Sequence, residues 1–156
     1  MNRIIIAGNG VAGLTAGDTL YRLGYEGTLT VVGQEPHSTY SRPALSKAAL
    51  SPGDGLDVNF LPDPTHGGTQ LLGREACSLD TASRILTLDD GTRLPYDGLI
   101  IATGSRARRF TDSPNEYTLR SLDDAEALKR RLNSRPSVTI IGGGALGMEV
   151  ASGAIN

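Results

Sequence analysis

A glycine-rich turn between an apolar segment and a helix-like segment most constrains how this chain can fold, and the chain carries two such turns. In the first, the β-branched run Arg3–Ala7 leads directly into Gly8–Gly13, with the spacing Gly-x-Gly-x-x-Gly. Leucines and alanines then recur at helical spacing as far as Gly24, and Thr28–Val32 is a second apolar run. Buried parallel strands have such continuous apolar sequences, and helices commonly end at glycine. The pattern therefore predicts a βαβ unit.

This kind of turn is suited to the pyrophosphate of a dinucleotide. The first glycine makes the tight turn, the second lets the main chain approach the phosphates, and the third lets helix and strand pack closely. The helix N-terminus offers free amides and the positive end of its dipole. An acid beyond the second strand holds the ribose hydroxyls, and Glu35 follows Gly13 by 22 residues, close to the ~20 expected. The strand–turn–helix–strand–acid context, more than the glycines alone, predicts dinucleotide binding.

The same arrangement begins again late in the chain. Ser137–Ile141 has a buried-strand pattern, Gly142–Gly147 is glycine-rich, and Met148–Ala154 is expected to be helical. The first glycines of the two turns are 134 residues apart. The acid that would complete this second motif would fall after residue 156. We therefore expect a nucleotide turn by ancestry, belonging to the first β-α unit of a second, incomplete Rossmann fold.

The segment between the two turns predicts shorter elements. Ser41 followed by Pro43 indicates a helix start and a short helix over Ala44–Leu50, and Pro52–Gly68 has the composition of a mobile surface loop. An Asp-Asp-Gly turn at 89–91 predicts a β-hairpin. The other expected elements are five strands and a charged helix: Thr69–Leu72, Ala76–Leu79, Arg84–Leu88, Thr92–Pro95, Gly98–Ala102 and Asp123–Leu132. The fold class is α/β, a Rossmann-like parallel sheet with helices and a small antiparallel β insertion, followed by the start of a second such fold.

Composition excludes several function classes. Fifteen Lys and Arg against seventeen Asp and Glu give a net charge of −2, so no basic field indicates nucleic acid or an anionic membrane. Cys77 is the single cysteine, which excludes an intramolecular disulfide and a redox dithiol; we expect it to be a small buried hydrophobe. His37 and His66 have no ligands spaced around them, so no metal site is expected. Apolar runs far shorter than the ~20 residues of a membrane span, and a start without a signal peptide, lead us to expect a cytoplasmic protein.

Five segments, in order, resemble one family of flavoproteins. Residues 3–13 are similar to its FAD fingerprint, and the most specific match is Tyr-Ser-Arg-Pro-Ala-Leu-Ser-Lys at 40–47, similar to the family's Tyr-Asp-Arg-Pro-Pro-Leu-Ser-Lys. Residues 96–104 resemble the Ala-Thr-Gly strand of two-dinucleotide flavoproteins, 117–132 a connecting segment, and 142–149 the NAD fingerprint with its following Glu. The chain thus resembles the N-terminal part of the FAD-dependent pyridine-nucleotide reductases that serve ferredoxins and rubredoxins, including putidaredoxin reductase.

The resemblance implies a FAD-binding domain at 1–115 and the start of an NAD(P)-binding domain at 116–156. It implies that hydride passes from NADH or NADPH to FAD, and that electrons then leave to a ferredoxin- or rubredoxin-type partner. Lys47 and Glu149 would form the catalytic pair near the flavin ring. The implied cofactor-binding residues are Gly8, Gly10, Val11, Ala12, Gly13, Gln34, Glu35, Arg42, Lys47, Ala76, Ala102, Thr103, Gly104, Arg120, Gly142, Gly144 and Gly147.

Other interpretations stay open at this point. A shortened homologue would bind FAD or an adenine nucleotide without passing electrons, and self-association would complete the missing part of its fold. A single-fold dehydrogenase would use NAD directly at Gly8–Gly13, but the Arg-Pro-x-Leu-Ser-Lys segment disfavours this. Disulfide reductases need a cysteine pair soon after the second strand, and residues 36–60 contain no cysteine.

Simpler explanations also exist for individual residues. Lys47 can be an ordinary solvated lysine, and Glu149 is favourable in the first turns of a helix through the dipole alone. The basic cluster of Arg106, Arg108 and Arg109 is either a solvated loop or a contact for a phosphate or an acidic partner.

Overall fold

The chain folds into two compact units. The computed structural model describes residues 1–47, 50 and 55–155. One unit comprises Met1–Tyr40 and Phe60–Gly104, and the other comprises Ser41–Asn59 and Ser105–Asn156. The predicted boundary between residues 115 and 116 stays a prediction about domains of the whole protein.

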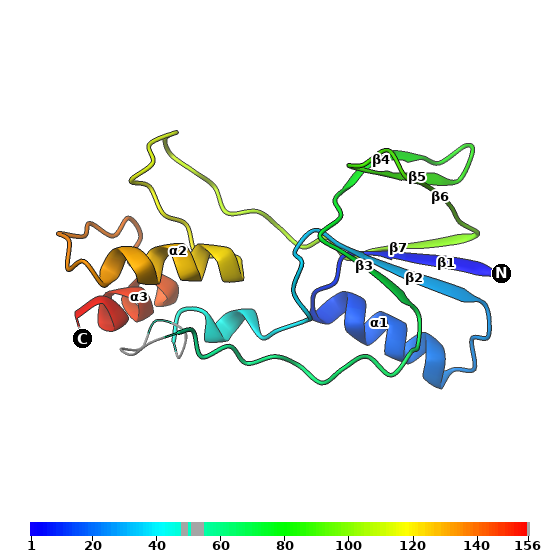
Figure 1. Ribbon diagram of the computed structural model, residues 1–156, viewed down its shortest axis with the longest axis horizontal. Coiled ribbons are helices and arrows are strands. Elements are labelled where there is room, and N and C mark those ends of the chain that lie inside the picture. Colours follow the sequence, from blue (N-terminus) through cyan, green and yellow to red (C-terminus); the bar gives the residue numbers. More distant parts are fainter. Residues whose placement is uncertain (48–49, 51–54, 156) are drawn as a thin grey trace. The chain divides into compact units, whose positions relative to one another are not determined.

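The first unit is built on a four-stranded parallel sheet. Its strands are β1 (Arg3–Ala7), β2 (Thr28–Gly33), β3 (Thr69–Leu72) and β7 (Gly98–Ile101), in the order β3-β2-β1-β7. Helix α1 (Val11–Arg22) connects β1 to β2 along one face of the sheet (Figure 1). The predicted βαβ unit is therefore confirmed, with β1 between β2 and β7 in parallel register.

A small antiparallel sheet completes this unit. It contains β4 (Ala76–Asp80), β5 (Ile85–Leu88) and β6 (Arg93–Pro95) in the order β4-β5-β6. The hairpin predicted from Asp-Asp-Gly joins β5 to β6, with Gly91 at a φ of +83°. Such a positive φ is readily adopted only by glycine. The α/β fold with an antiparallel insertion is confirmed, although the expected strand at 69–72 joins the parallel sheet.

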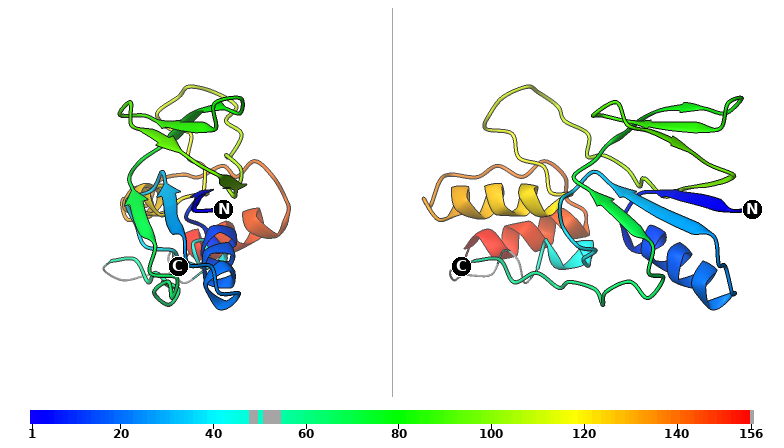
Figure 2. Two further views of the ribbon diagram at one scale, coloured as in Figure 1. Left: turned by 90° about the vertical axis from the view of Figure 1, so that its right-hand side faces the viewer. Right: turned by 45° about the vertical axis from the view of Figure 1, so that its right-hand side comes forward.

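After the exposed Arg3, strand β1 is apolar from Ile4 to Ala7 because both of its faces are covered. Ile4 and Ile6 point to the α1 side and pack with Leu29, Val31 and α1 side chains. Ile5 and Ala7 point the other way and pack with Val32, Leu86 and Leu88, the last two from the antiparallel sheet. Figures 1 and 2 show these three layers, with the parallel sheet between α1 and β4–β6. Residues that alternate along a strand face opposite sides, so a run without polar residues fits this central position.

The second unit contains α2 (Leu122–Leu132), α3 (Ala145–Ile155) and the short 3-10 helix η1 (Arg42–Ala44). A capping box starts α2: the Ser121 hydroxyl accepts from the Asp124 amide, and the Asp124 carboxylate accepts from the Ser121 amide. Leu122, Ala125 and Leu128 form the buried face of α2. The charged helix expected at 123–132 is thus confirmed.

Three sequence-based expectations about local structure are wrong. No α-helix forms over the described part of Ala44–Leu50, because the amides of Leu45 and Lys47 bond three residues back and Ser41 gives no side-chain cap; residues 48 and 49 of that segment lie outside the described residues. Residues 137–141 form no strand, since the described residues of the second unit supply no neighbouring strand to bond with. Cys77 is exposed rather than buried, because it lies on edge strand β4 beside a register shift at Ala76/Ser78.

The predicted loop at 52–68 contains no helix or strand in its described part, 55–68, apart from an isolated bridge between Tyr40 and Phe60. None of the helices in the described parts of the chain is long and apolar enough to cross a membrane.

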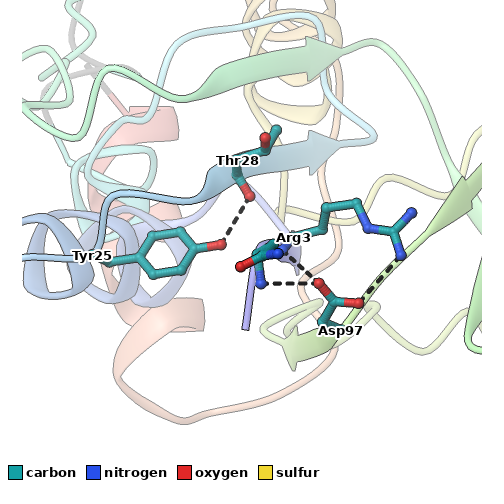
Figure 3. Close-up of polar contacts among 5 residues, drawn as sticks. Arg3, Tyr25, Thr28 and Asp97 are labelled. Atoms are coloured by element: carbon teal, nitrogen blue, oxygen red, sulfur yellow. Dashed lines mark hydrogen bonds and ion pairs between the residues drawn. The ribbon is translucent and has the colours of Figure 1, made fainter.

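A carboxylate ties the start of β1 to the start of β7. Asp97 accepts from the backbone amides of Asn2 and Arg3, each at 2.9 Å, and from the Arg3 guanidinium at 3.2 Å (Figure 3). Beside it, the Tyr25 hydroxyl donates to the carbonyl of Thr28 at 3.2 Å. The Arg3 side chain and then the two amides stabilise the charged form, so the pKa of Asp97 lies below its ordinary value.

The Asp97 contacts predict a pH-dependent effect on stability. A carboxyl with a lowered native pKa stabilises the fold above its unfolded pKa of ~3.9, and that contribution is lost as pH falls through the native value. Asp97→Asn should therefore lower the urea midpoint at pH 7, and the gap to the unsubstituted protein should narrow below about pH 4. Exposed Asp63 provides the control, since Asp63→Asn should leave the midpoint nearly unchanged at both pH values. A gap for Asp97→Asn that persists at low pH would contradict this explanation.

Candidate dinucleotide site

The first glycine turn is shaped by two close backbone contacts. Gly8 has a φ of +120°, and a Cβ placed on it would lie 2.1 Å from the carbonyl oxygen of Ala102. A Cβ on Gly13 would lie 1.9 Å from the carbonyl oxygen of Gly8. Real side chains do not approach backbone so closely, so both positions require glycine. The first and third glycines therefore do what the sequence pattern predicts: one makes the turn and the other lets α1 pack on β1.

Gly10 differs because the space beside it is open. A Cβ on Gly10 would meet no heavy atom of the described residues within 4 Å. Gly10 is the N-cap of α1 and has no side chain to occupy the amides of the first turn, and that turn has no acidic residue. Val11 and Ala12, the first residues of α1, are exposed. Free amides, the positive helix end and open space fit the pyrophosphate of a dinucleotide.

Thr39 braces the turn, a role that sequence reasoning missed. The Thr39 hydroxyl, which is almost fully buried, donates to the carbonyl oxygen of Asn9 at 3.0 Å. The Asn9 side-chain amide donates to the carbonyl of His37 at 3.4 Å. The middle of the turn is thus held by a segment about thirty residues later in the chain. A buried threonine just before the Tyr-x-Arg-Pro motif gives no sequence signal of this contact.

The acid after β2 is oriented by a tyrosine. The Tyr40 hydroxyl donates to a carboxylate oxygen of Glu35, and Tyr40 is buried. Gln34 donates to Glu75 at 3.1 Å, and the amides of Gly73 and Arg74 donate to the carbonyls of Glu35 and Gly33. These bonds hold the backbone that leads into Ala76 beside the predicted ribose-binding residues. Tyr40 belongs to the family motif but is not among the site residues that the sequence predicts.

The end of β7 lies over the first glycine. The Ala102 amide donates to the Ala7 carbonyl at 2.7 Å, and backbone atoms of Ala102 and Thr103 fill the space that a Cβ on Gly8 would need. Thr103 and Gly104 are exposed. The first unit therefore contains most of the predicted FAD-binding residues, which lie directly after β1, β2 and β7, at the start of α1 and in β4.

A second group of predicted residues meets within the other unit. The Lys47 ammonium lies 3.1 Å from Oε1 of Glu149, so the ion pair implied by the family resemblance is present. Ser46, which is buried, donates from its hydroxyl to Oε2 of the same carboxylate at 2.5 Å. The Ser46 hydrogen bond, and then Lys47, hold the pKa of Glu149 below its ordinary value. Sequence reasoning did not assign Ser46.

Two predicted arginines also meet in this unit. The Arg42 guanidinium donates to the backbone carbonyl of Arg120 at 2.6 Å, and Nε of Arg120 donates to the Ser105 carbonyl at 2.9 Å. Of the basic cluster after β7, Arg109 donates to the carbonyls of Ser113 and Glu116 and so closes its own loop. This contact favours a structural role for Arg109.

The second glycine turn repeats the geometry of the first. Gly142 has a φ of +120°, like Gly8, and a Cβ on Gly147 would lie 2.1 Å from the carbonyl oxygen of Gly142. Helix α3 then begins as α1 does, with the Met148 amide bonded to the Gly144 carbonyl at 3.1 Å. A Cβ on Gly144 would meet no heavy atom of the described residues within 4 Å. The turn is therefore formed even though 137–141 is not a strand.

The described residues contain no group of three or more His, Cys, Asp and Glu side chains that could hold a metal ion.

Comparisons with known proteins agree with this geometry. The pattern of the pyridine nucleotide-disulphide oxidoreductase family matches residues 2–156. The chain therefore belongs to that family. It is 37% identical to the ferredoxin–NAD(+) reductase subunit of the benzene 1,2-dioxygenase system of Pseudomonas putida, covering 97% of this chain and 38% of that protein. It is 35% identical to a rubredoxin-NAD(+) reductase of Pseudomonas putida, covering 97% of this chain and 42% of that protein.

A solved structure gives the same result. The chain matches the reductase of the covalent putidaredoxin reductase–putidaredoxin complex with a TM-score of 0.78 and 31% identity, covering 99% of this chain and 40% of that one. The predicted resemblance to ferredoxin and rubredoxin reductases is thus confirmed. The chain spans about two fifths of the length of these relatives.

Gly13 and Gly10 of the first turn should respond differently to substitution by alanine. Gly13→Ala forces a Cβ against the Gly8 carbonyl and should lower the free energy of unfolding by about 1–3 kcal/mol, as overpacking does. The methyl group of Gly10→Ala meets no heavy atom of the described residues, so this substitution should cost less than about 1 kcal/mol, as expected for alanine at an N-cap. Urea unfolding of both variants measures the difference. Equal losses would show that the close contact at Gly13 does not shape the turn.

Proposed function

We propose that this chain is the N-terminal, FAD-binding portion of an NAD(P)H-dependent ferredoxin-type reductase. The observation that carries the proposal is the first glycine turn, where Gly10 faces open space between two glycines that the fold itself requires. The acid after β2, already held by Tyr40, supplies the matching ribose contact. These residues fit a dinucleotide cofactor, and the named relatives are NAD(+)-dependent reductases.

Four segments of the first unit would bind FAD. The amides at Gly10–Gly13 receive the pyrophosphate, and Glu35 holds the adenosine ribose with Gln34 alongside. The backbone at Ala76 faces the adenine, while Ala102–Gly104 line the cofactor. FAD, when bound, accepts a hydride and releases electrons one at a time.

In the other unit, the cationic side chains act near the flavin and the second turn receives the nicotinamide nucleotide. Lys47 provides a positive charge whose position is set by Glu149, and such a fixed charge stabilises developing negative charge. Arg42 and Arg120 add further cofactor contacts. The turn at Gly142, Gly144 and Gly147 would take NADH or NADPH, within an NAD(P)-binding domain that starts near residue 116.

The electron acceptor is a ferredoxin- or rubredoxin-type protein. This proposal rests on the names of two relatives and on the solved complex with putidaredoxin. We further propose that the protein acts in the cytoplasm, where its single cysteine stays reduced.

A binding module without electron transfer is the second candidate function. It would bind FAD and associate with itself. Absorbance distinguishes the two functions: NADH bleaches the flavin band of a competent reductase and leaves that of a binding module unchanged.

The two glycine turns provide matched variants for testing FAD binding. FAD at 100 times its Kd should stabilise the protein by about 2.7 kcal/mol and raise its Tm. Gly10→Ala should abolish that rise, because the added methyl group occupies the space for the pyrophosphate. Gly144→Ala makes the same change in the second turn and should leave the rise intact. Differential scanning fluorimetry with and without FAD measures the Tm of the unsubstituted protein and of both variants. No rise in the unsubstituted protein, or an undiminished rise in Gly10→Ala, would refute the proposal.

A further inference from the structure

Ser46 is a buried polar residue with a specific partner far away in the chain. It is 5% exposed, and its hydroxyl donates to Oε2 of Glu149, 103 residues later. The carbonyl of Pro43, at 3.5 Å, is the more distant acceptor. Because a hydroxyl has one proton to donate, the shorter contact identifies Glu149 as its acceptor.

The two oxygens of the Glu149 carboxylate have separate partners. Oε2 is held by Ser46 from the buried side, and Oε1 faces the Lys47 ammonium at 3.1 Å. The Lys47 side chain is 58% exposed, and the Glu149 side chain is 34% exposed. Exposed ion pairs leave both long side chains free to rotate and contribute little by themselves. The short, buried side chain of Ser46 is therefore the group that fixes the orientation of the Glu149 carboxylate.

Helix α3 is placed to make this contact. Gly153 lies one turn after Glu149 on α3, and a Cβ on Gly153 would lie 3.3 Å from Cβ of Leu50, which is buried. Residues four apart lie on the same helix face. Glu149 thus faces Ser46 and Lys47, and Gly153 on the same side of α3 faces Leu50, where the absence of a side chain allows a close approach.

We propose that Ser46 is a positioning residue: its hydroxyl fixes one oxygen of Glu149 so that the other oxygen holds the Lys47 ammonium in a single place. The nearness of that ammonium to FAD rests on the proposed function. The contact between Ser46 and Glu149 does not, since it lies within one unit of the chain.

The titration of Glu149 reports this role directly. Among the described residues, Lys47 is the charged group that faces Glu149 and Ser46 is the neutral donor; both lower the pKa of Glu149, with Ser46 the larger cause. If Ser46 positions Glu149, removing its hydroxyl should raise the titration midpoint of Glu149. If Ser46 only fills space, the same change would alter the Tm of the protein and leave that midpoint unchanged.

The experiment is a carbon-13 NMR titration of the glutamate side-chain carboxyls in the full chain without FAD, with the Glu149 signal assigned by its loss in Glu149→Gln. Ser46→Ala should raise the Glu149 midpoint, and Ser46→Thr, which keeps the hydroxyl, should leave it near the unsubstituted value. If Ser46→Ala does not fold, Ser46→Cys replaces it, because its thiol is of similar size and a weaker donor; its midpoint should also rise.

An unchanged midpoint in the folded Ala or Cys variant would overturn the inference, and so would an equal rise in Ser46→Thr. Because the titration uses no FAD, its result is independent of the proposed function. Failure of FAD to bind refutes that function alone, while an unchanged midpoint in a protein that binds FAD refutes the positioning role alone.

Discussion

The contact between the Gly8 carbonyl and the backbone of α1 at Gly13 is the constraint on which the first unit depends. It brings the start of the helix against the end of β1, leaving no room for a side chain. Ala102 closes over Gly8 from the other side, so β7 is fixed by the same turn. The one glycine of this turn that the fold does not need, Gly10, then faces open space. A glycine without a structural reason, between two that have one, is what a phosphate site requires.

The second unit repeats this turn and adds a charge arrangement. Gly142 and Gly147 approach each other as Gly8 and Gly13 do, and the helix they start carries Glu149. That carboxylate joins the helix to the Ser46–Lys47 segment through one hydroxyl and one ammonium. Glu149 therefore connects the second glycine turn, which starts its helix, to Lys47. The proposed function places that lysine near FAD.

Local patterns predicted most of this fold. The apolar run at β1 and the hairpin at 89–91 each depend on neighbouring residues, and both elements are present. Several side-chain contacts were not predictable: Thr39 bracing Asn9, Tyr40 holding Glu35 and Ser46 holding Glu149 leave no periodic pattern. The ion pair between the distant residues Lys47 and Glu149 was expected only from the family resemblance. The strand expected at 137–141 failed for a related reason, since a strand depends on partners that its own sequence does not specify.

The central claim is that the amides at Gly10–Gly13 bind the pyrophosphate of FAD. A crystal structure of the protein grown with FAD tests it most directly. We expect density for the two phosphates within hydrogen-bond distance of these amides, with the adenosine ribose on the Glu35 carboxylate. A cofactor bound elsewhere, with the turn between β1 and α1 making no phosphate contact, would contradict it.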